Sequence, residues 1–362
     1  MLKKSYLVLL GGALMTAAVF SSCNNKDKED NTNDFTELES KTLSSFVSTL
    51  GTPLYAQFRE KASNLNQSVI TLATNPTEAN QTAARDAWRE VRVLWEQSEG
   101  FLIGPVDDNN YDPYMDTWPT DRSRLDSLLN SEAPLDADAL AGLTDTESET
   151  ELTLRGFHPL EYLLWKDGVN YTDREKEYMQ GLAQDILNNV TKLNADWVPF
   201  SEEFINAGQD GSRYESRQEA LIALADALTG ICEEVGDGKM KEPFVGVGGT
   251  PDSTITESPY SHNSVADFRN NIIGARNVYI CSFNGTEGTS LSDLVAANNK
   301  TLDQDILQKF EAVINSFDGI TTTFEKAIYD QPSAVQNVLT SIENLKTSLE
   351  SLQPYLQTYV KD

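Results

Sequence analysis

The sequence predicts an all-α protein made of two packed helical bundles. The main observation is helical periodicity, because apolar residues recur at steps of three and four in four long segments, at residues 178–197, 217–235, 291–317 and 335–356. Threonines typical of helix starts precede helical runs at Thr77 and Thr172, each followed by acidic residues. Alternation with a period of two is nearly absent. Long helices joined by mostly short loops are typical of bundles.

The first 22 residues are predicted to be a secretory signal. Lys3 and Lys4 give a basic start, residues 5–20 are nearly all apolar, and small residues precede Cys23. This arrangement resembles a bacterial lipobox, in which the cysteine is lipidated and becomes the new N-terminus. The apolar stretch is short for a full membrane span, so an uncleaved anchor is the weaker alternative. We therefore expect an exported protein that lipid chains on Cys23 hold at the membrane of the cell envelope.

Residues 23–34 are predicted to be a flexible tether, because this polar stretch has no apolar face to bury. Its charged run at residues 26–30 resembles the surface-export signal of some outer-membrane lipoproteins. We therefore expect the protein at the outer membrane, with its folded part exposed at the surface.

The chain carries a net charge of −28 at pH 7, and this balance limits its partners. Binding of nucleic acid is not expected, because phosphate contacts need clustered Lys and Arg. An acidic surface instead favours solubility and attracts cations.

Two cysteines remain besides Cys23. The spacing of Cys232 and Cys281 matches no metal motif, and an oxidising compartment permits a disulfide. We expect either two buried free thiols or a bridge between them.

The mature chain is predicted to divide into a first bundle at residues 35–207 and a second bundle at residues 208–362. The boundary is placed where Asn, Gly and Asp cluster at residues 206–212. Long loops are expected at residues 104–121 and 236–259. Long ordered loops in compact helical proteins are commonly functional.

His158 and Glu161 form the clearest candidate for a chemical site, in a chain with only two histidines. Three residues apart on a helix, they share one face, where imidazole and carboxylate can bind a single cation. Pro159 means that the helix begins near residue 158 or bends there, with Gly156 easing the bend. The structural alternative is that Glu161 simply lies in the first helical turn, where the helix dipole favours an acid. A bent helix would also aim both side chains into a cavity, so the two interpretations are compatible.

Two further groups of residues are candidates for a polar site. At the end of the glycine-rich loop, Ser261 is expected to cap a helix, or its neighbourhood presents a polar cluster at the domain junction. The candidates there are Glu257, Ser258, Ser261 and Asp267. Earlier in the chain, Arg and Trp residues lie at helical spacing with Glu96, which could supply a third oxygen ligand, although stacked Arg and Trp are commonly structural. The candidates in this group are Arg85, Trp88, Glu96, Trp118 and Asp121.

These motifs, taken in order, resemble the imelysin family. The residues that carry the resemblance are Ala84-Arg85-x-x-Trp88 with Gly104-Pro105 after it, Trp118-Pro119, Gly156-x-His158-x-x-Glu161 followed by Tyr162-Leu163-Leu164-Trp165, and Glu257-Ser258-x-x-Ser261 leading to Asp267. They span most of the mature chain. The resemblance implies two helical bundles with polar residues gathered between them. It also implies a role in iron or haem uptake at the cell envelope, with uptake proteins of the envelope as partners.

Three functions remain open at this point. The first is binding of iron or another divalent metal ion, or of a haem-related small ligand, by His158 and Glu161 with Glu96. The second is a metal-dependent peptidase, which the family name implies, with Glu161 or a nearby glutamate as base. A catalytic zinc normally has three protein ligands and an open position, and the His-Glu-x-x-His motif is absent, so a complete catalytic site is not evident. The third is a metal-free envelope module that binds a peptide, a glycan or a partner protein.

Overall fold

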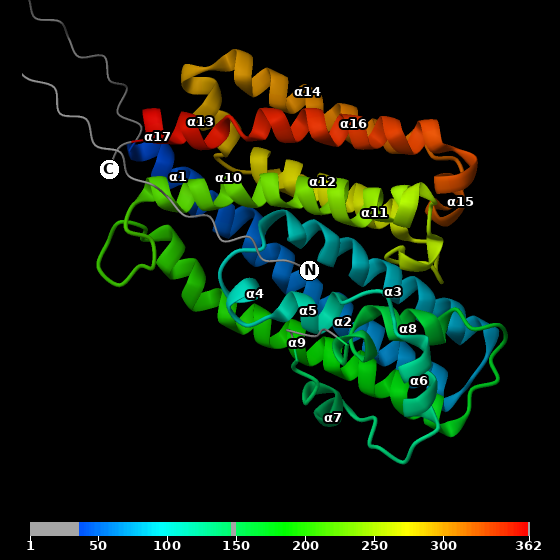
Figure 1. Cartoon of the computed structure of the whole chain (residues 1–362). Helices are drawn as coiled ribbons and strands as arrows, with labels where there is room; N and C mark the ends of the chain where they lie inside the picture. The colour runs from blue at the N-terminus through cyan, green and yellow to red at the C-terminus, as the bar shows by residue number, and fades with distance from the viewer. Residues whose placement is uncertain (1–35, 146–149, 361–362) are drawn as a thin grey trace, which may run out of the picture. The chain divides into compact units, whose positions relative to one another are not determined.

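Helices form nearly all of the regular structure (Figure 1). The computed structural model describes residues 36–145 and 150–360, so the predicted signal and tether lie outside the described residues. The only strands in these two ranges are β1 (Ser282–Phe283) and β2 (Thr286–Glu287), which form a small antiparallel hairpin. The predicted all-α fold class is therefore confirmed.

The first set of helices is built around α2, which packs against both α3 and α9, while α8 lies against α3 and α9. Helices α4 to α7 are short and cover the same group. The elements of this set are α1 (Thr36–Ser45), the π-helical η1 (Phe46–Gly51), α2 (Thr52–Thr74), α3 (Glu78–Ser98), η2 (Glu99–Phe101), α4 (Pro105–Asp108), α5 (Tyr111–Asp116), α6 (Arg122–Leu129), α7 (Ala137–Ala141), η3 (Leu152–Leu154), α8 (Phe157–Leu164) and α9 (Asp173–Ile205).

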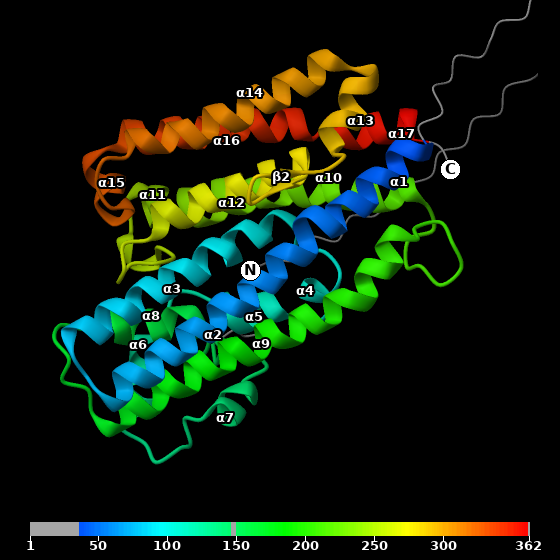
Figure 2. The same ribbon diagram turned by 180° about the vertical axis from the view of Figure 1, so that it is seen from behind.

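The second set is built around α10, which packs against α12, α16 and α17, with α14 against α12 and α16. Figures 1 and 2 show α10 and α12 lying between α3 and the pair α14 and α16. The elements are α10 (Arg217–Glu233), the π-helical η4 (Glu234–Met240), α11 (Lys241–Val245), η5 (Val247–Gly249), η6 (Ser253–Ile255), α12 (Ser264–Ile280), α13 (Leu291–Asn298), α14 (Lys300–Ser316), η7 (Phe317–Gly319), α15 (Phe324–Asp330), α16 (Pro332–Leu349) and α17 (Leu352–Tyr359).

Helix α12 joins the two sets, because it packs on α3 and η2 as well as on α10 and α14. The described residues all belong to a single unit of contacts. The boundary predicted at residues 207 and 208 falls between α9 and α10 and stays a prediction. Among the described residues, no helix combines the length and the apolar character needed to cross a membrane.

The helices begin and bury their apolar faces where the sequence predicts. The Thr77 hydroxyl accepts a hydrogen bond from the backbone of Asn80 at 3.2 Å, and Thr172 forms a capping box with Glu175. The apolar stripe of the last long helix is fully buried. Its members in α16 are Val335, Val338, Ile342, Leu345 and Leu349.

Three segments differ from the prediction, and one of them is the loop expected at residues 236–259, which contains α11 and three short helical turns. The helical run at residues 291–317 is interrupted at Asn299, whose side chain accepts from the backbone of Leu302 and starts α14. The expected loop at residues 104–121 contains α4 and α5, which are too short to show a full apolar period. Cys232 and Cys281 are both buried free thiols, one of the two expected outcomes.

Two glycines allow η2 and α12 to approach closely, and this contact places α3 beside α12. A Cβ atom on Gly274 would lie 2.2 Å from the carbonyl oxygen of Gln97, and one on Gly100 would lie 2.7 Å from the backbone nitrogen of Ala275. Backbone atoms cannot move aside as a flexible side chain can. The spacing between the two helices therefore depends on the absence of side chains at both positions.

We expect Gly274→Ala to destabilise the protein by about 1–3 kcal/mol, because the added methyl group overpacks the contact with α3. The control is Gly230→Ala, in the interior of α10, where no atom of another element lies within 4 Å of the added Cβ. That change should stabilise the protein by about 0.5–1 kcal/mol, since glycine is a poor helix former. Urea unfolding of both variants measures the difference. Equal free energies of unfolding would contradict the packing argument.

Candidate functional site

A group of ionisable and polar side chains is buried where α3, η2, α5, α8, η4 and α12 meet. None of them is more than 2% exposed. This buried polar cluster consists of Arg92, Glu96, Glu99, Asp116, His158, Glu161, Lys239, Glu257, Ser258, Asp267 and Asn271. Removing a charge from water costs several kcal/mol unless another charge or hydrogen bonds compensate, so the members must balance one another.

Arg92 of α3 is the central cation of the cluster. Its Nη2 atom lies 2.9 Å from Glu257 Oε1 and contacts Glu96, its Nη1 atom contacts Asp116, and its Nε atom lies 3.5 Å from Asp267 Oδ1. These four carboxyl groups come from α3, α5, the segment before α12 and α12 itself. A guanidinium group suits this role because its donors fan out in one plane and it stays charged.

His158 reaches the cluster because α8 begins tightly against the end of α5. Gly156 precedes α8 with φ of +83°, and a Cβ atom there would lie 2.1 Å from the carbonyl oxygen of Met115. Glycine alone adopts this conformation at no steric cost and leaves room for that carbonyl. Asp116 directly follows Met115, so the turn brings its carboxylate beside the imidazole.

The imidazole of His158 is held between two carboxylates. Its Nδ1 atom lies 3.4 Å from Glu161 Oε2, and its Nε2 atom lies 3.0 Å from Asp116 Oδ1. The other oxygen of Glu161 accepts from the backbone amides of Tyr260 and Ser261, at 3.0 and 2.7 Å, and from the Ser261 hydroxyl at 2.7 Å. Glu161 is therefore fixed in place. Burial lowers the pKa of His158, but its contacts with Asp116 and Glu161 outweigh burial and raise that pKa to about 9.

Lys239 is the second buried cation with several carboxylate partners. Its Nζ atom lies 2.9 Å from Glu99 Oε2 and 3.1 Å from Glu257 Oε1. The Nδ2 group of Asn271 donates to Glu96 Oε2 at 2.7 Å and also to Glu99. Glu257 thus accepts from both buried cations, which links the two ends of the cluster.

The cluster holds six carboxyl groups and three basic groups, so it has an excess of acids. Burial raises the pKa of Glu99 well above its ordinary value, and the nearby Glu96 raises it further. Burial also raises the pKa of Glu257 and, by more, that of Asp267. A site in which several carboxyl groups resist ionisation favours the entry of additional positive charge.

Two overlapping groups in the cluster have the donor spacing of a metal site. One ligand atom from each of Asp116, His158 and Glu257 lies within 4.8 Å of the others, and the same is true of Glu96, Glu99 and Asp116. The first group offers one imidazole nitrogen and carboxylate oxygens, a set that suits iron, manganese or zinc. Burial raises the pKa of Asp116, but Arg92 and His158 lower it more, so this carboxyl group stays charged.

The structure brings together most of the predicted site residues. The predicted metal-binding residues Glu96, His158 and Glu161 lie in the cluster, together with Glu257, Ser258 and Asp267, and Ser261 borders it. The Ser258 hydroxyl donates to Asp267 Oδ2 at 2.7 Å. That Glu96 and Glu161 bind a metal ion stays a prediction.

The other four candidates support the cluster from outside. Arg85 donates through Nε to the carbonyl of the last residue of α8, at 2.7 Å, and Trp88 donates to the carbonyl of its first residue, at 3.2 Å. Together they fix α8 on α3. Asp121 caps α6. The ring of Trp118, which precedes a cis peptide bond to proline, lies over the ammonium group of Lys239 at 5.4 Å.

Ser261 does not cap a helix, so that expectation is wrong. Helix α12 begins at Ser264 with Asn263 as its N-cap residue, and the Ser261 side chain bonds to Glu161 instead. The other histidine, His262, has a side chain that is 53% exposed and pairs with Glu325 at 3.1 Å. The His262 side chain is therefore not part of the buried polar cluster.

Sequence reasoning missed Lys239, Glu99 and Asn271, and it did not single out Arg92 and Asp116 as ligand partners. Charged residues between apolar ones on an amphipathic helix ordinarily face solvent. The spacing of Glu96 and Glu99 at three residues was a usable signal, since it matches that of His158 and Glu161. No local pattern marks Lys239.

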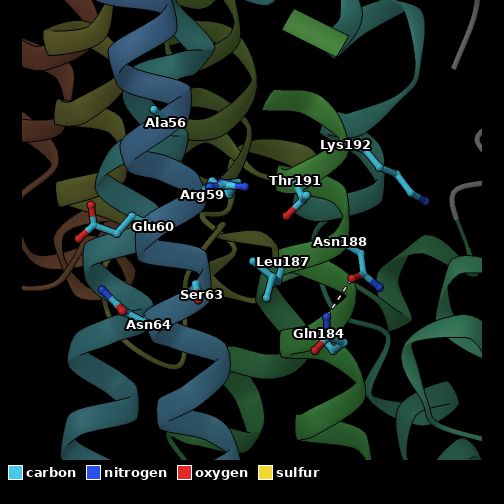
Figure 3. Close-up of a pocket in the computed structure, with 10 residues that line it drawn as sticks. All are labelled: Ala56, Arg59, Glu60, Ser63, Asn64, Gln184, Leu187, Asn188, Thr191 and Lys192. Carbon is cyan, nitrogen blue, oxygen red and sulfur yellow. Dashed lines mark hydrogen bonds between the residues drawn. The ribbon is translucent and has the colours of Figure 1, made fainter. Parts of the chain in front are cut away.

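A surface hollow between α2 and α9 is separate from the cluster (Figure 3). It has a volume of about 790 Å³, and Arg59 extends into it from α2 towards α9. The opposite wall carries Gln184 and Asn188, which bond to each other at 2.8 Å. None of the predicted site residues lines this hollow.

The fold and the cluster define a class of helical protein in which histidine and carboxylate side chains are buried between packed helices. The sequence profile of the imelysin family matches residues 51–352, and the chain belongs to this family. It is 29% identical over 306 residues to iron-regulated protein A of Synechococcus elongatus, covering 83% of this chain and 78% of that protein.

Two crystal structures have a similar fold. One is described as an iron-regulated protein A precursor from Parabacteroides distasonis; it has a TM-score of 0.80 and 23% identity and covers 88% of this chain and 95% of the other. The other is an imelysin-like protein from Psychrobacter arcticum, with a TM-score of 0.73, 14% identity, and coverage of 89% and 96%. At these identities, the likeness concerns the fold alone.

We expect Arg92→Met to destabilise the protein by about 3–5 kcal/mol, because four buried carboxyl groups lose their shared cation. The matched control is Arg89→Met, one turn earlier on α3, whose side chain is 43% exposed, pairs with an exposed aspartate and lies over the ring of Trp165 at 4.8 Å. That change should cost about 0–1 kcal/mol. Chemical denaturation compares the two. Similar losses would mean that Arg92 is not the organising charge of the cluster.

Proposed function

We propose that this protein binds one divalent metal ion, iron in the cell, through His158, Asp116 and Glu257. The observation that carries the proposal is a fully buried carboxylate oxygen, Glu257 Oε2, that has no hydrogen-bond partner in the protein and belongs to a group that also holds His158 and Asp116. Leaving such an oxygen unsatisfied is costly, and a metal ion would satisfy it. The donor atoms of the three residues are close enough to share one ion.

The surroundings of His158 also fit a metal ligand. In metal sites, a coordinating histidine commonly has its other ring nitrogen bonded to a carboxylate, which fixes the orientation of the ring. Glu161 occupies that place on Nδ1, and three donors hold its second oxygen. In this arrangement Glu161 positions His158, and Nε2, which releases its proton when the ion binds, faces Asp116 and the ion. A bound ion would supply positive charge to a cluster that has an excess of carboxyl groups.

Iron is the proposed ion for two reasons. Mixed imidazole and carboxylate ligands suit Fe²⁺ among the biologically available metals. The similar protein from Synechococcus elongatus carries the name iron-regulated protein A, which supports an iron-related role for this chain as well. A single ion fits the site better than haem, because the donor atoms lie within 4.8 Å of one another.

Binding is favoured over peptide cleavage by the burial of the site. A catalytic metal in a peptidase keeps an open position that the substrate reaches. Here the side chains of Asp116, His158 and Glu257 are at most 2% exposed, so a peptide bond has no direct path to them. A buried ion exchanges only when the surrounding segments open locally, which suits retention.

We further propose that the protein is a lipoprotein of the cell envelope, anchored through Cys23. The basic start, the apolar stretch and the small residues before Cys23 support this. An envelope position would place the binding site where iron enters the cell, with uptake proteins of the envelope as partners.

The matched pair of histidine variants tests metal binding. We expect the chain without its first 22 residues to bind about one Fe²⁺ under anaerobic conditions and His262→Ala to bind it equally, because the His262 side chain is exposed and apart from the cluster. His158→Ala should lose more than about 100-fold in affinity. Elemental analysis and calorimetric titration measure both.

Two outcomes would contradict this proposal. Equal iron content in His158→Ala, or none in the unmodified protein, would favour the metal-free module that binds a peptide, a glycan or a protein. Cleavage of a peptide by the metal-loaded protein, stopped by a chelator and absent from His158→Ala, would favour the peptidase.

The anchor is tested by Cys23→Ser in the full chain, with Cys232→Ser as the control on a buried thiol. Lipid chains hold a protein at a bilayer in proportion to the methylene groups they bury. We expect Cys23→Ser to move from the membrane fraction to the soluble fraction and to lose incorporation of labelled fatty acid. Membrane retention with no fatty acid on either protein would mean that another segment provides the anchor.

A further inference from the structure

Lys239 is buried among carboxyl groups in a way that ordinary lysines are not. Its ammonium group lies 2.9 Å from Glu99 Oε2, 3.1 Å from Glu257 Oε1 and 3.6 Å from Glu96 Oε2, and the partly exposed Glu234 lies 3.5 Å away. The ring of Trp118 lies on a further side at 5.4 Å. The side chain is fully buried, although lysine keeps a strong hydration shell and is rarely found without access to water.

A π-helical segment of the backbone directs the Lys239 side chain into the cluster. Helix α10 continues into the π-helical segment η4 before α11 begins. The wider turns of a π-helix change the direction of successive side chains, and such segments are common at functional sites. Lys239 points into the cluster, while Asp237 and Lys241, two residues to either side, are each 56% exposed and pair with each other at 2.7 Å.

The carboxyl groups around Lys239 have the composition of a cation site. Glu96 and Glu99, two of the partners of Lys239, have ligand atoms within 4.8 Å of each other and of Asp116, and Glu257, a third partner, belongs to the adjacent group with Asp116 and His158. Glu257 takes part on both sides: Oε1 accepts from Lys239, and Oε2 is buried without a partner. Glu257 therefore has one oxygen bonded to the ammonium group of Lys239 and one oxygen without a partner. This indicates that the cluster can accept more positive charge than the side chains of the protein supply.

We propose that the ammonium group of Lys239 occupies a second cation position, formed by Glu96, Glu99 and Glu257, beside the proposed metal site. In this arrangement Lys239 acts as a tethered cation, which limits the protein to one free ion. The position has oxygen donors only, so without the lysine it would accept a cation that prefers oxygen, such as Mn²⁺, Mg²⁺ or Ca²⁺. This proposal rests on the proposed function for the first ion, at His158, and the role of Lys239 itself does not depend on it.

The lysine would determine how many ions the cluster holds. Two divalent ions bridged by shared carboxylates form a centre with different chemistry from that of one ion. A covalently attached ammonium group cannot exchange and carries a single charge. The structure therefore assigns Lys239 the task of keeping the centre mononuclear.

The test removes the positive charge of Lys239 and keeps a side chain of similar shape. Lys239→Met retains an unbranched side chain without the ammonium group, and Lys241→Met is the control, since that lysine is exposed and outside the cluster. Each chain is unfolded in urea, refolded with or without Mn²⁺ and passed through gel filtration, and its manganese content is measured. We expect Lys239→Met to hold about one Mn²⁺ more per chain than the unmodified protein, with its thermal midpoint raised more by Mn²⁺. Lys241→Met should match the unmodified protein.

A variant that does not fold without metal still gives an answer. Refolding of Lys239→Met only in the presence of Mn²⁺ supports a second cation position. Failure to refold under either condition, or refolding with no additional ion, overturns it. The double variant Lys239→Met with Glu99→Gln removes one acid along with the lysine. It should fold without metal and bind no more Mn²⁺ than the unmodified protein does.

The second ion and the first are separated by combining Lys239→Met with His158→Ala. If both proposals hold, this double variant loses the ion at His158 and keeps the additional one. An unmodified protein that binds no metal, beside a Lys239→Met variant that binds one ion, would refute the proposed function and leave the tethered cation standing. One ion in both proteins would refute the tethered cation alone.

Discussion

The arrangement of this protein depends on one buried guanidinium group. Arg92 on α3 contacts carboxyl groups of α3, α5, α12 and the segment before α12, so a single side chain ties together elements that are far apart in the sequence. The close approach of α12 to η2, which two glycines allow, brings Asp267 within reach. The two features depend on each other. The buried carboxyl groups are stable only beside a cation, and Arg92 reaches all four of them only because the helices lie close together.

The buried cluster also contains more acidic groups than basic groups. Arg92, Lys239 and His158 face six carboxyl groups, and an interior with more acids than bases either holds protons or takes up cations. A purely structural network would be expected to satisfy its donor and acceptor atoms. Here Glu257 Oε2 is left without a hydrogen-bond partner, in the group of ligand atoms where a metal ion would satisfy it. The same imbalance accounts for a buried lysine, which would be costly in an apolar core.

Much of the fold could be predicted from the sequence, because helical periodicity and capping residues act locally. The apolar stripe of α16 and the caps at Thr77 and Thr172 needed no knowledge of distant residues. The pair of His158 and Glu161 was also visible, since three residues separate them. The site as a whole was not: Lys239 joins it through a π-helical turn, and Asp116 joins it through the close approach of Met115 to Gly156. Such contacts depend on tertiary packing, which no spacing along the chain records. The expected cap at Ser261 failed for the same reason, because a distant Glu161 binds that hydroxyl.

The most direct test of the account is X-ray absorption spectroscopy at the iron edge of the Fe²⁺-loaded protein, beside its Glu257→Gln variant. The account predicts a first shell of nitrogen and oxygen only, with the scattering signature of one imidazole ring, and a weakened oxygen shell in the variant. A spectrum without imidazole scattering would contradict the claim that His158 binds the ion. A spectrum with sulfur in the first shell would place the iron elsewhere in the chain.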